Sequence, residues 1–179
     1  MHATMQTQKG KFSMNRNSRI WSAAGLLLAV IPLGGAAQKS SLPGQRKTPS
    51  EFPWAASRNN QAGSAMQPGL ETVFVAGDGK GKELYSLVFK VPPRTAIPPH
   101  SHPDDRSCFV LSGLWYFGYG DVRREEDLKA LPVGSNYTEP AGAAHFAGTR
   151  EQEAMVECTA FGPTGTTFVN PGDDPRKKQ

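Results

Sequence analysis

Three of the four histidines lie in two short stretches, and their spacing suits a metal ion. His100 and His102 belong to the stretch PPHSH (98–102), and His145 ends the stretch PAGAAH (140–145). Side chains alternate along an extended segment, so His100 and His102 face the same side and can bind one ion together. A third imidazole from a distant strand leaves positions open for water or substrate. We therefore expect one divalent transition metal, Fe, Mn, Ni, Zn or Cu, on His100, His102 and His145.

Short strands must bring these two stretches together. Gly and Pro separate the apolar runs that follow residue 66, which favours strands over helices. We expect strands or extended segments at 71–76, 84–91, 95–102, 107–111, 114–119, 136–139, 145–149, 154–161 and 166–170. The charged segment 121–129 is expected to be a loop or a short helical turn. Many short strands with turns between them predict an all-β sandwich or a closed barrel.

The two histidine stretches resemble the two sequence motifs of the cupin superfamily. The second motif, G-x5-P-x-G-x2-H-x3-N, is matched by Gly134, Pro140, Gly142 and His145, with Thr149 in place of the Asn. The first, G-x5-H-x-H-x(3,4)-E-x6-G, is matched by His100, His102 and Gly113. The resemblance is to small single-domain cupins of the RmlC-like type. It implies a double-stranded β-helix, the cupin jelly-roll barrel, as one domain over residues 67–172.

Two positions depart from the first motif. Arg94 stands at the opening Gly position, and Arg106 stands at the Glu position. An arginine is a permanent cation and cannot bind a metal as the Glu would. Three alternatives follow: a site of three histidines alone, an oxygen ligand from Asp104 or Asp105, or a metal-free pocket in which Arg106 binds an anion. If the two aspartates are not ligands, they form a solvated turn.

Other side chains near the motifs are candidates for ligand binding. Arg106 could hold a substrate carboxylate or enolate by charge-assisted hydrogen bonds. Tyr116 and Phe146 are aromatic candidates, although we expect most aromatic residues of this region to fill the barrel core. Glu139 could be a ligand or a base, but an exposed acid at the end of a strand is the expectation.

The chain has two cysteines, Cys108 and Cys158. The cupin resemblance implies that the strand after the first motif lies beside the last barrel strand, which would bring the two cysteines together. An exported chain would allow them to form a disulfide. Two buried free thiols, or a thiolate ligand from Cys108, are the alternatives.

The N-terminal region looks like an export signal. Arg16 and Arg19 precede the apolar run 21–31, and small residues follow at 35–37, so we expect a signal peptide over 1–37 with cleavage after Ala37. Residues 38–66 are polar and aperiodic, which indicates a flexible linker or an arm, with Phe52 and Trp54 pinning it to the domain. Residues 173–179 form a charged tail. We therefore expect a periplasmic or secreted protein without stable membrane insertion after the leader is removed.

The charge of the chain argues against nucleic-acid binding. The net charge of +4 comes from the leader, whose four basic residues account for the excess of 20 Lys and Arg over 16 Asp and Glu. The rest of the chain has no basic stripe with interleaved aromatics. The expected partner is a small molecule, and the resemblance also implies a homodimer.

Three functions remain open from the sequence, of which the last is an interaction scaffold that has kept only the fold. The first is an exported metal-binding cupin that acts on a small carboxylate or carbonyl-containing molecule, in the manner of a dioxygenase or an isomerase. The alternative is a cupin that binds a sugar or an anion without turnover. The sequence does not decide whether the protein is an enzyme, because fold does not fix function.

Overall fold

The computed structural model describes residues 42–56 and 62–177, all within one compact unit that spans Ser40–Gln179. The expected signal peptide at 1–37 lies outside the described residues. Within them, no helix is long and apolar enough to cross a membrane.

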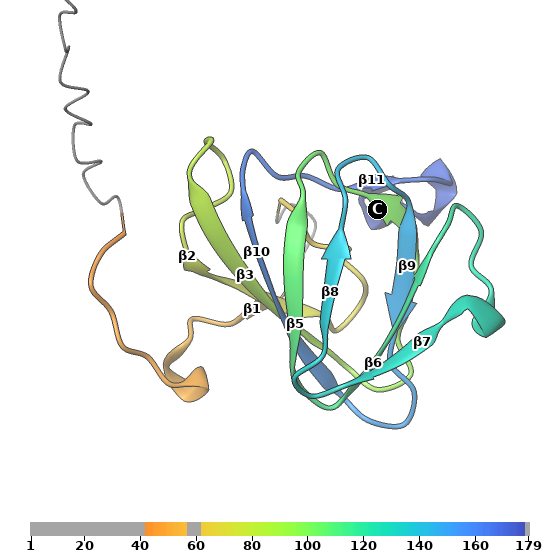
Figure 1. Cartoon of the computed structure of the whole chain (residues 1–179), viewed down its shortest axis with the longest axis horizontal. Helices are drawn as coiled ribbons and strands as arrows, with labels where there is room; N and C mark the ends of the chain where they lie inside the picture. The colour runs from red at the N-terminus through yellow and green to blue at the C-terminus, as the bar shows by residue number, and fades with distance from the viewer. Residues whose placement is uncertain (1–41, 57–61, 178–179) are drawn as a thin grey trace, which may run out of the picture. The chain divides into compact units, whose positions relative to one another are not determined.

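Two antiparallel sheets curve around a common interior (Figure 1). The first contains, in spatial order, β1 (Ala55–Ala56), β2 (Glu71–Ala76), β3 (Leu84–Val91), β10 (Ala154–Phe161), β5 (Arg106–Ser112) and β8 (Asn136–Glu139). The second contains β11 (Thr167–Phe168), β4 (Ala96–Ser101), β9 (His145–Gly148), β6 (Leu114–Tyr119) and β7 (Lys129–Pro132). The described helices are single 3₁₀ turns: η1 (Pro49–Glu51), η2 (Glu125–Asp127), η3 (Pro171–Asp173) and η4 (Pro175–Lys177). The predicted all-β jelly-roll fold is confirmed.

Alternating burial sets which side chains enter the barrel. On β5 the buried residues are Arg106, Cys108 and Val110, and the residues between them face outward. On β8 the buried residues are Tyr137 and Glu139. Strand side chains alternate with a period of two. The register of a strand therefore determines which alternate residues face the interior. The inward faces of β3, β5, β6 and β10 thereby form an apolar core that includes Trp115, Phe117 and Val156.

Cys108 and Cys158 face each other across β5 and β10. They are opposite one another in the strand register and are joined by a disulfide. Both residues are fully buried in the core. Their sulfur atoms are therefore not thiolates and cannot serve as metal ligands.

Part of the predicted linker packs on the barrel. Ala55 and Ala56 extend the first sheet by pairing with β2. The indole nitrogen of Trp54 donates a hydrogen bond to the carbonyl of Pro49, and the Lys90 ammonium lies 4.4 Å from the Trp54 ring centroid. Further along, the side chains of Ser64, Ala65 and Met66 are buried. The short strands β1 and β7 were not predicted, because neither has an alternating apolar pattern.

Candidate metal site

Strands β4 and β9 place the three histidines together. His100 and His145 are opposite each other in the register of these strands, and their ring centroids are 4.4 Å apart. A β-bulge between Ile97 and His100 lets both residues face the interior despite their odd spacing. His102 follows two residues later, and its ring centroid lies 5.0 Å from that of His100 and 5.1 Å from that of His145.

A turn within the second histidine stretch holds that stretch against the first. Gly142 has a φ of +73°, a left-handed conformation that glycine adopts without strain. Its backbone N–H donates to the carbonyl oxygen of His102 at 2.8 Å. The turn therefore ties the loop before β9 directly to the H-x-H segment.

Each histidine ring is oriented through its Nδ1 atom. Backbone carbonyls lie within hydrogen-bond distance of all three: Pro98 for His100 at 2.7 Å, Gly165 for His102 at 2.6 Å, and Ala143 for His145 at 3.1 Å. With a proton on Nδ1, each Nε2 presents a lone pair, which is the arrangement seen in metal-binding histidines. One ligand atom from each ring lies within 4.8 Å of the others.

Burial keeps two of these rings neutral. It lowers the pKa of His100 to about 3 and the pKa of His102 well below its ordinary value, with the charge of Arg106 adding to the effect at His102. The Nε2 atom of His145 is buried and has no hydrogen-bond partner among the described residues. A buried, unpaired lone pair beside two neutral imidazoles fits a transition-metal ion well.

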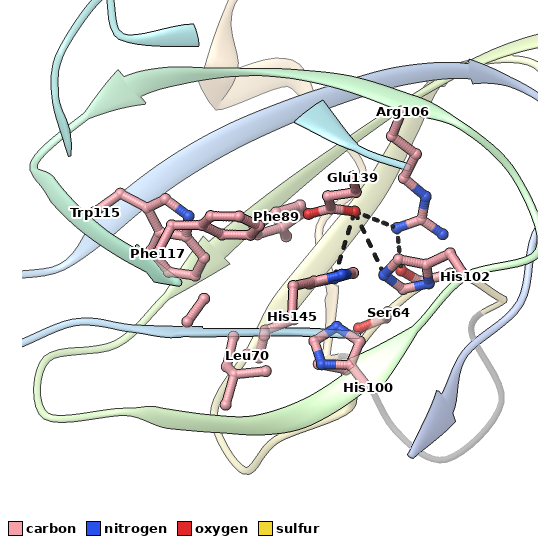
Figure 2. Close-up of a pocket in the computed structure, with 14 residues that line it drawn as sticks. Ser64, Leu70, Phe89, His100, His102, Arg106, Trp115, Phe117, Glu139 and His145 are labelled. Carbon is pink, nitrogen blue, oxygen red and sulfur yellow. Dashed lines mark hydrogen bonds and ion pairs between the residues drawn. The ribbon is translucent and has the colours of Figure 1, made fainter. Parts of the chain in front are cut away.

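Glu139 adds a carboxylate to this group. Its Oε2 atom lies 3.4 Å from His102 Nε2 and 3.8 Å from His145 Nε2 (Figure 2). The side chain is only 5% exposed because Glu139 occupies an inward position on β8. The expectation of an exposed acid at this strand end is therefore wrong.

Arg106 points into the barrel, but its charge is already paired. Its Nε donates to Asp104 at 3.2 Å, Nη1 donates to the Gly63 carbonyl at 3.0 Å, and Nη2 donates to the Thr164 hydroxyl at 2.5 Å. Nη1 also lies 3.4 Å from Glu139 Oε2. All three guanidinium nitrogens thus have protein partners, which argues against the metal-free anion pocket.

The two aspartates beside Arg106 have different roles. Asp104 is buried and also accepts hydrogen bonds from the hydroxyls of Tyr85 and Thr164, so its expected place in a solvated turn is wrong. Asp105 is exposed and accepts a hydrogen bond from the Ala141 backbone N–H at 2.7 Å. The side chains of Arg106, Asp104 and Glu139 together carry one positive and two negative formal charges, which favours a cation nearby.

A small cavity adjoins these residues, with a volume of about 20 Å³. Figure 2 shows its two sides. The histidine side consists of His100, His102, His145, Glu139 and Arg106, and the aromatic side consists of Leu70, Phe89, Ile97, Trp115, Phe117 and Ala147. The remaining wall is formed by Gly63, Ser64 and Ala65 of the N-terminal arm. Gly63 must be a glycine, since a Cβ atom there would lie 2.8 Å from Arg106 Nη2, at a φ of +79°.

Comparisons with known proteins agree with this architecture. No family model matches the chain. Germin-like protein 9-3 from Oryza sativa subsp. japonica is 26% identical over 91 residues, which are 50% of this chain and 42% of that protein, so the chain spans less than half of this relative. The polyketide cyclase RemF from Streptomyces resistomycificus superposes with a TM-score of 0.56 at 20% identity, over 75% of this chain and 92% of RemF. An RmlC-like cupin from Shewanella frigidimarina NCIMB 400 matches with a TM-score of 0.49 at 13% identity, over 67% and 92% of the two chains.

The chain has the cupin fold. The carboxylate near the histidines comes from a different strand than the first motif would predict. Arg106 occupies the position at which the first motif has Glu, and it pairs in register with Glu139 on the neighbouring strand β8. The acid is thus supplied from across the sheet, at the residue before Pro140.

The predicted site residues divide into two groups. His100, His102, His145 and Arg106 meet at the cavity. Tyr116 and Phe146 do not line it. Tyr116 alternates with the inward residues of β6 and lies under the Arg150 guanidinium, 4.3 Å from the ring centroid. Phe146 follows His145 on β9, so it faces the other side of the sheet, where the Arg123 guanidinium lies 5.8 Å from its ring centroid.

The inward position of Glu139 has a signal in the sequence. Asn136–Glu139 alternates polar and buried positions, so Tyr137 on the interior face also implies Glu139 on that face. The contribution of Gly63, Ser64 and Ala65 had no comparable signal, because their segment is polar and aperiodic.

Proposed function

We propose that this cupin binds one divalent transition metal through His100, His102 and His145, with Glu139 as an additional ligand. The observation that supports this most directly is the set of three buried rings, each held by a carbonyl at Nδ1, with the Nε2 atom of His145 left unpaired. The net negative charge of the surrounding side chains adds to the attraction for a cation.

We further propose that the protein is an enzyme for a small carbonyl-containing molecule. A metal at such a site supplies Lewis acidity and open positions for substrate or water. Arg106 holds the Glu139 carboxylate in place, and the enclosed cavity limits access of bulk water. The likeness to a polyketide cyclase supports chemistry on carbonyl groups, although dioxygenase or isomerase reactions fit the same site.

Recognition of a substrate carboxylate by Arg106 is less well supported than recognition of a carbonyl. The guanidinium is buried and already donates to Asp104, Gly63 and Thr164. A substrate anion would have to displace one of these partners. Any substrate carboxylate would therefore depend on the metal for its counter-charge.

Export remains part of the proposal. Its support is the positively charged and apolar leader pattern at 14–37, together with the buried disulfide between Cys108 and Cys158. Disulfides persist in oxidising compartments and are rare in the cytosol of most organisms. Alkaline phosphatase fused after residue 66 would be active outside the cytoplasm if the leader directs export, and inactive if it does not.

Elemental analysis tests the metal site. The full chain, purified without an affinity tag and then offered Fe, Mn, Ni, Zn and Cu, should retain about one metal per chain. The His100→Ala/His145→Ala variant should retain none. A parent protein that binds no metal under any of these conditions would refute the proposal.

Two acid-to-amide variants test the additional ligand. Glu139→Gln should weaken metal binding by roughly tenfold to a hundredfold, as is typical for loss of a group that supports a metal site. Glu157→Gln is the matched control, because Glu157 faces outward on β10 and binds Ser86 away from the cavity. Equal metal affinities of the two variants would remove Glu139 from the ligand set.

A further inference from the structure

The aromatic side of the cavity contains polar hydrogens without acceptors. The indole Nε1 of Trp115 and the hydroxyl of Tyr137 are buried and have no hydrogen-bond partner in the described part of the chain. Leaving such a donor unpaired costs about 1–3 kcal/mol, so buried unpaired donors call for an explanation. The third unpaired buried atom is His145 Nε2, which the proposed metal accounts for.

The two donors lie close to each other and to the proposed metal site. Trp115 lines the cavity, and Figure 2 shows its indole nitrogen on the side of the ring that faces Glu139. Burial, followed by the charge of Glu139, raises the pKa of Tyr137 well above its ordinary value. The Trp115 indole N–H and the Glu139 carboxylate both approach the Tyr137 hydroxyl, but neither reaches hydrogen-bond geometry with it.

The surroundings of the Trp115 nitrogen are otherwise apolar. Leu70, Phe89 and Phe117 line the same side of the cavity. Among the described residues, Arg106 is the only cation that lines the cavity, and its three nitrogens already have protein acceptors. A ligand atom at this place must therefore accept a hydrogen bond without needing a counter-charge.

We propose that Trp115 Nε1–H is the donor that fixes the substrate, by binding one uncharged acceptor oxygen of a small and otherwise apolar molecule beside the metal. The oxygen would be that of a carbonyl, an ether or a hydroxyl group. The cavity volume of about 20 Å³ limits the part of the ligand bound here to a few non-hydrogen atoms. This inference rests on the proposed function for the presence of the metal, and it adds the class of ligand and the residue that selects it.

The indole N–H resonance of Trp115 tests the proposal in the unchanged full chain. The protein is labelled with ¹⁵N, loaded with Zn²⁺, which is diamagnetic, and titrated with acetone as a minimal carbonyl probe. The Trp115 resonance should shift downfield and saturate. The Trp54 indole is the internal control and should not move, because it already donates to the Pro49 carbonyl. Xenon, which has no acceptor atom, should fill the cavity without the downfield shift.

The variant Trp115→Phe identifies the resonance and tests the energy of the hydrogen bond. Its affinity for acetone, followed through the methyl groups of Leu70 and Ile97, should fall about threefold to tenfold, as expected for loss of one hydrogen bond. Unchanged affinity, or saturation of the methyl shifts without movement of the Trp115 resonance, would overturn the proposal. The titration of the unchanged chain remains decisive if this variant does not fold.

Failure of the metal proposal gives a different result. Zinc content is measured in the same samples, so a chain without metal is recognised before the titration begins. Acetone is then titrated into the metal-free protein, where the Trp115 resonance still reports on the subsite. A protein with about one zinc per chain and no response to acetone would refute the subsite alone.

Discussion

The two sides of the cavity differ in how their polar atoms are satisfied. On the histidine side, every Nδ1 atom and every guanidinium nitrogen of Arg106 lies at hydrogen-bond distance from a protein oxygen. On the aromatic side, the indole N–H of Trp115 is buried and unpaired within the described residues, as is the hydroxyl of Tyr137 near it. The first side is therefore organised before any ligand arrives, as metal sites require. The second side is completed only by a ligand or a bound water.

The largest effect should come from removing the cation on the histidine side. Arg106→Met leaves Asp104 and Glu139 buried without their shared partner, so the metal-free protein should lose about 3–5 kcal/mol of unfolding free energy in urea. Arg94→Met is the control, because its ion pair with Glu151 is exposed and should contribute less than about 1 kcal/mol. Similar losses in the two variants would show that the histidine side is not held together by Arg106.

The disulfide tests whether the histidine side also depends on a covalent link. Cys108→Ala/Cys158→Ala removes a bond that closes a segment of 50 residues, and should lower the unfolding free energy by about 2–4 kcal/mol. The number of metal ions per chain should stay the same, because the sulfur atoms are not ligands. A variant that folds but binds no metal would contradict this separation of roles.

Metal binding should stabilise the folded chain through the histidine side alone. At a free metal concentration about 100 times the Kd, the gain is about 2.7 kcal/mol, seen as a higher Tm that a chelator reverses. The His100→Ala/His145→Ala variant should have the same Tm with and without metal. A shift of equal size in this variant would mean that the ion binds elsewhere.

The smallest effects are expected when two buried tyrosines, Tyr85 and Tyr137, are each replaced by phenylalanine. Tyr85 donates to Asp104, and burial raises its pKa to about 12, so Tyr85→Phe should cost about 1–3 kcal/mol by leaving that carboxylate short of a donor. Tyr137→Phe removes a hydroxyl that has no hydrogen-bond partner among the described residues, so it should be neutral or stabilising in chemical unfolding. Equal destabilisation by both changes would show that Tyr137 is hydrogen-bonded in the native protein, for example by a water molecule.

Sequence reasoning recovered the elements that have strong local patterns. Residues 71–76, 84–91 and 114–119 coincide with β2, β3 and β6 because their apolar residues are bounded by turn residues. The three histidines were found from their spacing alone. The partner of Arg106 was not found, because pairing between Arg106 and Glu139 depends on the register of β5 and β8, which are separated along the chain. The alternation of polar and apolar residues along 136–139 does predict that Glu139 faces the interior. No such pattern predicts that Gly63, Ser64 and Ala65 form a wall of the cavity.

The contact between Gly63 and Arg106 affects where this domain can be cut. A chain shortened to begin at Leu70 would keep β2 and every later strand, all three histidines, Glu139 and the disulfide. It would lose the Gly63 carbonyl, which accepts a hydrogen bond from Arg106 Nη1. It would also lose the cavity wall that Gly63, Ser64 and Ala65 form. Such a fragment would contain both histidine motifs, yet the cavity beside its histidines would be open to bulk solvent on the side of the missing wall.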